Sequence, residues 1–348
     1  MKANNSTGLL FIGYFLSGKG VGRCVCEDLS KRFEDEGYLV FRTSFSTNRF
    51  IRILEMAFTI IAKRNHYQAA YVEVYNGLAF IWAEITCALL RILSKPYVIT
   101  LHGARMVQFA ERWPRRVRLL LQRADVVTTP SRLFAERFST WRPDILYLPN
   151  AIDLSNYDFI PRSRIQPNLC WLRKFESIYN PPLAIVATKM LLQEFPIINL
   201  TMGGAIIEGE SFRNCESIIS KYNLESNIQL PGFIKRSEIR QWFNKSDIYL
   251  NTTFVESFGI AVMEAAACGL CIVTTNVGEL PYLWEDGVDA LLVPPNDPDA
   301  MAAAVKRILS EPGLAERLSK NARKKAEQFD WSVILPQWEK LIEEVIEN

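Results

Sequence analysis

Short apolar runs alternate along this chain with longer stretches in which apolar and polar residues recur at helical spacing. An apolar run at residues 9–16 leads into a glycine-containing segment at 17–22 and then a helical pattern at 23–36. This alternation continues to an apolar run at 145–148. Strands alternating with amphipathic helices are typical of a parallel sheet covered by helices.

An irregular segment interrupts this alternation near the middle of the chain. It contains Pro161, Pro167 and several polar residues, after which the strand–helix alternation starts again. The pattern therefore predicts four parts: an N-terminal domain at 1–153, a linker at 154–167, a C-terminal domain at 168–328 and a C-terminal helix at 329–348 that packs back on the first domain.

Both predicted domains are doubly wound α/β domains of the Rossmann-like type. Ligands of open α/β sheets bind beyond the carboxyl ends of the strands. We therefore expect the two domains to face each other across a cleft, each presenting one ligand-holding edge. Such a layout suits a reaction between two substrates.

The charge of the chain is unevenly distributed. The 348 residues carry a net charge of only +2, with 49% apolar and 22% charged residues, an ordinary globular composition. Residues 1–150 contain 21 Lys and Arg against 12 Asp and Glu, a balance of +9, which leaves 19 against 26, or −7, for the remainder. The basic half predicts contact with nucleic acid, an anionic membrane surface or a phosphorylated acceptor, or else attraction between the two halves.

The cysteine and histidine content argues against a metal centre. Cys268 and Cys271 form a lone Cys-x-x-Cys without a second pair, and the chain has only two histidines, His66 and His102. Reduced thiols fit a cytoplasmic protein. No uncharged stretch reaches the roughly 18 residues of a membrane span, and the run at 9–16 is interpreted as a buried strand instead of a signal peptide.

The strongest chemical signal is the segment from Glu256 to Glu264, which follows a predicted strand at 247–251. A helix beginning here leaves unpaired backbone amides that can hold an anion or sugar hydroxyls. Gly259 allows a ligand to approach the backbone closely. The Glu256 carboxylate can accept hydrogen bonds from sugar hydroxyls.

Glu264 is unusual because its helix is apolar almost all round. Such a helix is buried, and a buried carboxylate needs partners. The ribose hydroxyls of a bound nucleotide would supply them. The alternative is that Glu256 caps the helix and Glu264 pairs with a distant lysine or arginine.

These residues resemble the signature of the GT-B-fold retaining glycosyltransferases of the family 4 type, the glycosyl transferases group 1. That signature is Glu-x7-Glu, with Phe-Gly after the first glutamate and Glu-Ala-x-Ala-x-Gly around the second, and both parts occur here. The resemblance implies that Glu256 contacts the donor sugar and Glu264 the nucleotide ribose. It also implies that the backbone at three consecutive residues holds sugar or phosphate: Phe258, Gly259 and Ile260.

Further matches extend over most of the chain. His102, followed by glycine at the end of the predicted strand 96–101, resembles the family histidine beside the donor sugar, and a strand end is where a ligand-facing imidazole belongs. Gly20 and Gly22 lie in a glycine loop that borders acceptor and diphosphate in the family, and Gly278 lies in a second such turn. The simpler interpretation of these glycines is tight turns.

One departure concerns the diphosphate. The family usually has an arginine and, a few residues later, a lysine in the first loop of the second domain. Here Arg173 is present, but the later lysine is not, and the adjacent Lys174 would point differently along an extended chain. A compensating arginine, an altered donor preference or weak activity would each follow from this difference.

A basic stretch at residues 112–118 includes Trp113 and four arginines. Family members with lipid-linked acceptors often rest on the membrane through a basic, aromatic helix, so peripheral contact with the inner membrane face is one interpretation. A solvated helix face is the other.

The sequence thus predicts a glycosyltransferase that moves a hexosyl group from a nucleoside diphosphate sugar to a glycan, lipid-linked or small-molecule acceptor, as in polysaccharide biosynthesis. The resemblance implies retention of configuration. We expect no metal cofactor, because no Asp-x-Asp lies at a strand end, and no nucleic-acid partner. The alternatives are a non-catalytic nucleotide- or carbohydrate-binding protein, an epimerase, and an NAD-dependent oxidoreductase, which is disfavoured because the second predicted strand ends without an acidic residue.

Overall fold

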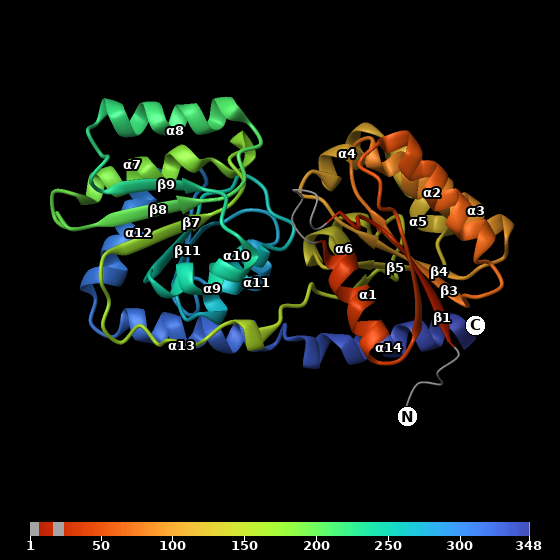
Figure 1. The fold of residues 1–348 in the computed structure, drawn as a ribbon. Helices are drawn as coiled ribbons and strands as arrows, with labels where there is room; N and C mark the ends of the chain where they lie inside the picture. Colours follow the sequence, from red (N-terminus) through yellow and green to blue (C-terminus); the bar gives the residue numbers. More distant parts are fainter. Residues whose placement is uncertain (1–6, 17–23, 348) are drawn as a thin grey trace. The chain divides into compact units, whose positions relative to one another are not determined.

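The computed structural model describes residues 7–16 and 24–347 (Figure 1). The described part of the chain forms two compact units, each with its own parallel sheet. The N-terminal unit comprises Met1–Asn150 with Ser332–Asn348, and the C-terminal unit comprises Ala151–Trp331.

The sheet of the N-terminal unit has the strand order β2-β1-β3-β4-β5-β6. Its strands are β1 (Gly8–Ile12), β2 (Leu39–Thr43), β3 (Ala69–Val74), β4 (Tyr97–Leu101), β5 (Val126–Thr129) and β6 (Leu146–Tyr147). Its helices are α1 (Val25–Asp35), α2 (Arg49–Ala62), α3 (Ala79–Ile92), α4 (Met106–Arg112), α5 (Pro114–Arg123), α6 (Arg132–Phe138) and α14 (Trp331–Glu347).

Two layers of helices cover this sheet. Apolar residues of α2, α3, α5 and α6 share one core with side chains from one face of the strands. On the other face, α1 and α14 pack through aromatic rings: Phe33 lies 5.8 Å from Phe11, and Trp338 lies 5.5 Å from Tyr71. Buried apolar surface on both faces explains why the central strands β1, β3 and β4 are almost continuous apolar runs.

The sheet of the C-terminal unit has the order β12-β11-β10-β7-β8-β9. Its strands are β7 (Asn168–Leu172), β8 (Asn199–Gly203), β9 (Ile228–Gly232), β10 (Ile248–Asn251), β11 (Cys271–Thr275) and β12 (Leu291–Val293). Its helices are α7 (Pro181–Leu191), α8 (Gly209–Lys221), α9 (Arg236–Asn244), α10 (Ile260–Ala267), α11 (Leu280–Leu283), α12 (Pro298–Ser310) and α13 (Leu314–Glu327), with short 3₁₀ turns at Leu154–Asn156 and Ser177–Tyr179. One face is covered by α7, α8 and α12, and the other by α9, α10 and part of α13.

The predicted fold class, two Rossmann-like doubly wound parallel-sheet domains, is confirmed. The segment between β4 and β5 contains two helices, α4, which ends at Arg112, and α5, which begins at Pro114. Proline has no backbone N–H to continue a helix but fits the first helical position, so α5 begins at Pro114.

The residues predicted as a linker, 154–167, lie within the C-terminal unit. Arg162 is buried there, donates a hydrogen bond to the Ser246 carbonyl at 2.8 Å and pairs with Asp247 at 3.1 Å. Proline and polar residues signalled an irregular backbone correctly, but these contacts hold it against the sheet.

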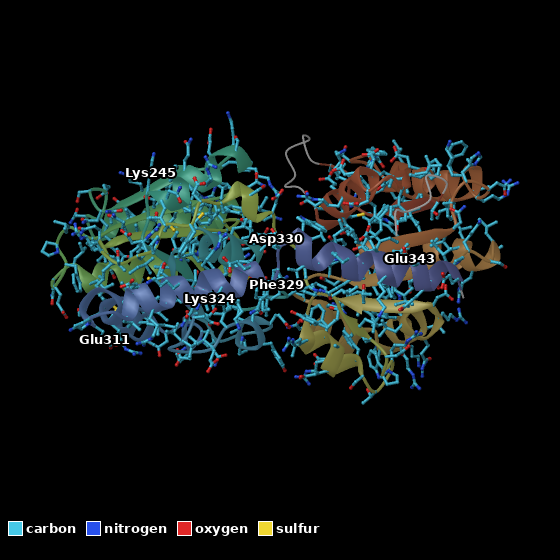
Figure 2. The ribbon with its side chains drawn as sticks, turned by 90° about the horizontal axis from the view of Figure 1, so that it is seen from below. Lys245, Glu311, Lys324, Phe329, Asp330 and Glu343 are labelled. Carbon is cyan, nitrogen blue, oxygen red and sulfur yellow. The ribbon has the colours of Figure 1, made fainter. Side chains whose placement is uncertain are left out.

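The chain returns to the N-terminal unit where α13 ends and α14 begins, at Phe329 and Asp330 (Figure 2). Ile152 fastens this passage through two backbone hydrogen bonds, to the Phe329 carbonyl at 2.9 Å and from the Trp331 amide at 3.1 Å. Residues 332–348 then group with the first unit. Among the described residues, no helix is both long enough and apolar enough to span a bilayer.

Each sheet contains one point at which the strand order reverses. In the N-terminal unit this is between β1 and β3, and in the C-terminal unit between β7 and β10. Helices leave adjacent strands toward opposite faces at such a point, which opens a crevice at the carboxyl ends where α/β proteins hold ligands. The two crevices are therefore the places to look for function.

Candidate functional site

Arg173 and Glu256 meet at the crevice of the C-terminal unit. Arg173 follows β7, and Glu256 lies five residues beyond β10, whose last residue is Asn251. The Arg173 guanidinium pairs with the Glu256 carboxylate, and its Nε donates to Asn251 Oδ1 at 3.2 Å. Burial acts to lower the pKa of Arg173, but the neighbouring Glu256 charge raises it above its ordinary value. Arg173 is therefore a permanent cation with one anionic partner inside the protein.

Glu256 also contacts the backbone at the start of α10. Its Oε1 accepts hydrogen bonds from the Ser257 amide at 3.1 Å and the Phe258 amide at 3.5 Å. Both amides precede α10, so Glu256 fixes the loop before the helix and is not the side-chain cap considered as the alternative. Gly259 is the N-cap of α10, with no side-chain cap, so amides such as that of Ile260 are available to a ligand.

Glu264 is buried on α10 and binds a hydroxyl group. Its Oε1 accepts a hydrogen bond from the Tyr157 hydroxyl at 2.6 Å. Burial and then the Glu264 charge raise the pKa of Tyr157 well above its usual range, so the phenol keeps its proton and donates it. The Tyr157 hydroxyl is an O–H donor like the ribose hydroxyls expected there, and the Glu264 charge also helps to raise the pKa of Arg173, so a cation lies nearby as well.

Tyr157 was missed by sequence reasoning because it falls in the segment interpreted as a linker. The signal available was an aromatic residue in an irregular stretch that also contains Phe159, which is a weak one. Only the path of this segment across the C-terminal unit brings Tyr157 to a glutamate 107 residues away.

Two glycines hold the backbone around these side chains. Gly278 has a φ of 58°, and a Cβ there would lie 2.1 Å from the Glu256 carbonyl oxygen. Gly204 has a φ of 148°, and a Cβ there would lie 1.6 Å from the carbonyl oxygen of Arg173. A larger residue at either position would push an acidic or basic site residue out of place, so Gly278 has a packing role here besides its predicted contact with the donor.

The cations near this crevice differ from the usual pair. Arg173 is largely buried, whereas Lys174 is exposed, so the two side chains do point differently. Arg236, the first residue of α9, is close enough for its charge to oppose the rise in the pKa of Tyr157. Arg236 is therefore a second positive charge near Tyr157, which sequence reasoning did not identify.

In the N-terminal unit, His102 lies directly after β4 and is buried. Its amide donates to the Val74 carbonyl at 2.8 Å, and its ring stacks on Tyr75 with the centroids 5.3 Å apart. Burial lowers the pKa of His102 to about 4, so the imidazole is neutral at neutral pH. It is not an ion-pair partner under those conditions.

Glu73 is the neighbour of His102 and another residue that sequence reasoning missed. It lies in the fully buried strand β3, with its Oε1 3.8 Å from His102 Nε2 and accepting from the Cys26 amide at 3.0 Å. Burial raises the pKa of Glu73 to about 7. Within the described residues, Glu73 Oε2 and His102 Nε2 are buried without a hydrogen-bond partner. A lone glutamate in an apolar strand was the available sequence signal.

A cavity of about 520 Å³ opens beside this cluster, at the crevice between β1 and β3. Two aromatic rings and two guanidinium groups contribute to its lining: Tyr14, Trp82, Arg49 and Arg52. The Arg52 guanidinium lies 5.0 Å from the Tyr14 ring centroid and 4.8 Å from that of Trp82. Such a lining can bind a ligand that carries both an anionic group and a ring.

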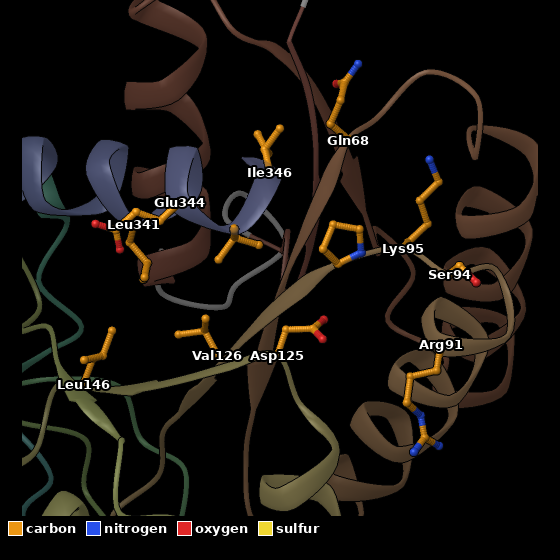
Figure 3. Close-up of a pocket in the computed structure, with 12 residues that line it drawn as sticks. Gln68, Arg91, Ser94, Lys95, Asp125, Val126, Leu146, Leu341, Glu344 and Ile346 are labelled. Atoms are coloured by element: carbon orange, nitrogen blue, oxygen red, sulfur yellow. The ribbon is translucent and has the colours of Figure 1, made fainter. Parts of the chain in front are cut away.

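A larger cavity of about 920 Å³ lies at the opposite edge of the same sheet (Figure 3). Gln68 and Asp125, which line it, precede β3 and β5, and Leu341 and Ile346 of α14 close it. It therefore lies at the amino ends of the strands, away from the edge where α/β ligands bind. We exclude it from the candidate site in spite of its size.

Gly20 and Gly22 lie outside the described residues. One crevice thus holds six of the predicted residues: Arg173, Glu256, Phe258, Gly259, Ile260 and Gly278. Glu264 lies further along α10, the helix that begins at Ile260. The structure places His102 in the other unit, beside Glu73.

Comparison with known proteins places this chain among glycosyltransferase-like sequences. A family profile described as glycosyl transferases group 1 matches residues 166–325. D-inositol 3-phosphate glycosyltransferase of Streptomyces bingchenggensis is 26% identical over 164 residues, 45% of this chain and 36% of the relative. Glycogen synthase of Mycobacterium tuberculosis is 25% identical over 283 residues, 75% of this chain and 66% of the relative. The matches thus span less than two thirds of these relatives.

Two solved structures show the same fold over nearly the whole chain. HepE of Anabaena, in complex with UDP and glucose, has a TM-score of 0.80 at 18% identity, covering 97% of this chain and 100% of that one. Sucrose-phosphate synthase from Thermosynechococcus elongatus has a TM-score of 0.81 at 17% identity, covering 98% and 99%. The chain therefore has the two-domain GT-B fold, and its residues 166–325 are similar to the glycosyl transferases group 1 family.

Proposed function

We propose that this protein transfers a glycosyl group from a nucleoside diphosphate sugar to an acceptor hydroxyl, with retention of the anomeric configuration. The observation that carries this proposal is the grouping at the crevice of the C-terminal unit. There a buried cation, a carboxylate and uncapped helix amides lie together, and a second carboxylate on the same helix holds a hydroxyl. The named relatives and the UDP-bound neighbour point to the same substrate class.

Each group has a matching part of the donor. Glu264 would exchange the Tyr157 hydroxyl for ribose hydroxyls, because both are O–H donors. Arg173 and the amides at Gly259 and Ile260 would bind the diphosphate, with Arg236 supplying the charge of the absent lysine. Glu256 would accept hydrogen bonds from the sugar while keeping Arg173 in place.

The chemistry then depends on the departing diphosphate. As the bond between the anomeric carbon and the phosphate oxygen breaks, negative charge grows on the diphosphate, and Arg173 and the helix amides stabilise it. The acceptor oxygen forms the new bond to the anomeric carbon on the same side, and its proton passes to the leaving diphosphate. No step of this scheme requires a metal ion.

We assign the acceptor to the cavity of the N-terminal unit. Arg49 and Arg52 favour an acceptor with a phosphate or carboxylate group, and Tyr14 and Trp82 favour one with a ring. The roles predicted for His102, Gly20 and Gly22 stay predictions.

A second candidate function is nucleotide-sugar binding without transfer. The Arg173–Glu256 ion pair favours it, because a cation neutralised by the protein has less charge to offer a diphosphate.

One experiment separates these functions. The full chain is incubated with UDP-, GDP- and ADP-sugars, with water taking the place of the acceptor hydroxyl, and both ligand-induced thermal shift and slow nucleoside diphosphate release are measured. Transfer predicts a thermal shift and release, both strongly reduced in Glu264→Ala and retained in the control Glu316→Ala, whose half-buried glutamate lies on α13. A shift without release indicates a binding protein, and no shift with any donor contradicts both proposals.

A further inference from the structure

Helix α2 presents an unusual outer face. Five large apolar side chains on it are exposed: Phe50 by 81%, Phe58 by 73%, Leu54 by 68%, Ile51 by 50% and Ile61 by 45%. Single exposed apolar residues are ordinary, but a group of five on one helix of 14 residues is not. This face is exposed in the structure and therefore open to a partner.

The five side chains form one continuous stripe, which we call the α2 stripe. At 3.6 residues per turn, they fall within an arc of about 100° around the helix axis. The charged residues of α2, Arg49, Arg52 and Glu55, fall outside that arc. The opposite side carries Met56 and Ile60, which are buried in the core. Helix α2 is thus apolar on two sides, and only one of them is covered by its own unit, where it lies beside α3 (Figure 1).

Positive charge borders the α2 stripe at both ends. Arg49 is the first residue of the helix, Lys63 and Arg64 follow its end, and all three are exposed. The one acidic residue of this helix, Glu55, accepts hydrogen bonds from the Phe45 and Ser46 amides at 3.0 Å each. With Arg52, residues 48–64 carry four positive charges against one negative, a balance of +3.

The basic stretch at 112–118 lacks these properties. Arg116 pairs with Glu84 at 2.9 Å and lies 5.7 Å from the Trp113 ring. Val117 is buried, and Trp113 is the one exposed large apolar residue between 112 and 118. The sequence suggested membrane contact at 112–118, but the exposed apolar and basic residues that such contact needs are on α2.

We propose that the α2 stripe docks this protein onto a lipid bilayer that contains anionic headgroups. The helix would lie in the interfacial plane with the phenylalanine and leucine side chains among the acyl chains. Arg49, Lys63 and Arg64 would then reach the headgroup phosphates.

A second copy of this chain fits the stripe less well. In a two-fold dimer through α2 running antiparallel, the basic N-terminal end of one helix would lie against the basic C-terminal end of the other. Like charges would then face each other at both ends, whereas an anionic bilayer neutralises all of them.

The docking does not depend on the proposed transfer, although it would serve it. Arg49 belongs both to α2 and to the lining of the cavity assigned to the acceptor. On the proposed function, an acceptor held in the bilayer by a lipid anchor would reach that cavity from the docked surface.

The test is co-sedimentation of the full chain with vesicles of phosphatidylcholine alone and of phosphatidylcholine with phosphatidylglycerol in equal parts. We expect binding to the mixed vesicles that weakens with salt. The double variant F50S/F58S should bind roughly tenfold or more weakly, since each phenylalanine loses apolar burial. K63Q/R64Q should bind roughly fivefold more weakly for each charge removed.

The control is F233S/I197S, which removes two comparably exposed apolar residues, by 66% and 73%, from the C-terminal unit. It should bind vesicles like the unsubstituted chain. Lack of vesicle binding by the unsubstituted chain, or equal binding by F50S/F58S, would overturn the proposal. A dimer, seen by sedimentation, that only the F50S/F58S substitutions dissociate would also overturn it. Equal binding to both vesicle types would overturn the choice of an anionic surface. Because no donor is present, these outcomes are independent of the proposed transfer.

Discussion

At the crevice of the C-terminal unit a buried cation is paired with a carboxylate, whereas in the N-terminal unit Glu73 and His102 are buried with pKa values shifted toward their neutral forms. Arg173 is paired with Glu256, and Glu264 accepts the Tyr157 hydroxyl. By contrast, burial raises the pKa of Glu73 to about 7 and lowers that of His102 to about 4.

The two crevices therefore hold their polar groups by different means. Pairing keeps a buried group charged, and desolvation without a partner favours its neutral form. A permanently charged crevice suits a diphosphate. A crevice of groups that titrate suits hydroxyl recognition and proton exchange.

Arg173→Ala should have the largest effect on this contrast. It leaves the Glu256 carboxylate buried without its cation, which costs about 2–4 kcal/mol of unfolding free energy after allowing for partial solvent access. Loss of one transition-state donor should also lower nucleoside diphosphate release roughly 100- to 1,000-fold. Denaturant unfolding and release assays measure the two effects.

The matching double variant is Arg173→Ala with Glu256→Gln. Removing the unpaired charge should restore most of the stability and none of the activity. If activity returned with stability, Arg173 would have only a structural role.

Glu264→Ala should have the next largest effect. A hydrogen bond to a charged group is worth about 1.5–3 kcal/mol, so donor affinity should fall roughly 10- to 100-fold. Tyr157→Phe is the comparison, because it removes the competing hydroxyl and leaves the carboxylate. It should cost about 1 kcal/mol of stability without weakening the donor, as measured by titration calorimetry. Equal loss of affinity in both variants would mean that the phenol, and not ribose, is the functional partner.

Glu73→Gln should change how stability depends on pH. The folded-state pKa of Glu73 is raised to about 7, above its ordinary value, so the folded chain binds the extra proton between these values. Its contribution to stability is present at low pH and is lost as pH rises through about 7. The unfolding free energy of the variant, relative to that of the unsubstituted chain, should therefore rise by on the order of 2 kcal/mol as the pH increases from 5 to 8. Urea unfolding across this range measures the gain.

His102→Asn should change the pH dependence of stability in the opposite direction. With its pKa lowered to about 4, His102 binds fewer protons in the folded chain, so its contribution is lost as pH falls from its ordinary pKa toward 4. The variant should gain stability on acidification. Parallel slopes in the two variants would contradict the assignment of neutral forms to both groups.

Arg236→Ala should have the smallest effect. If Arg236 supplies the charge of the absent lysine, donor affinity should fall severalfold, with roughly 1 kcal/mol lost for a partly solvated contact. Arg213→Ala on α8 is the matched control and should leave affinity unchanged. Steady-state kinetics with the best donor compares the KM values of the two variants. Equal KM values would mean that Arg173 and the helix amides bind the diphosphate without Arg236.

Much of the fold followed from local pattern. The period of apolar residues identified strands and helices because side-chain direction repeats about every 3.6 residues in a helix and about every 2 in a strand. The same local pattern placed Glu256 just before a helix and Glu264 within it. It also put Arg173 at the end of a strand. It failed at 154–167, where prolines indicated a loop but long-range contacts made that loop part of a domain.

The sequence by itself determined the two sheets, the order of elements and the acidic motif on α10. Only the tertiary structure decided that Tyr157 reaches Glu264, that Glu73 faces His102 from the adjacent strand, and that α2 leaves an apolar side uncovered. The reason is physical: helical periodicity shows that α2 has two apolar sides, but which side is buried depends on the surface against which the helix packs. Contacts between distant residues are likewise set by how the layers close, which no local pattern contains.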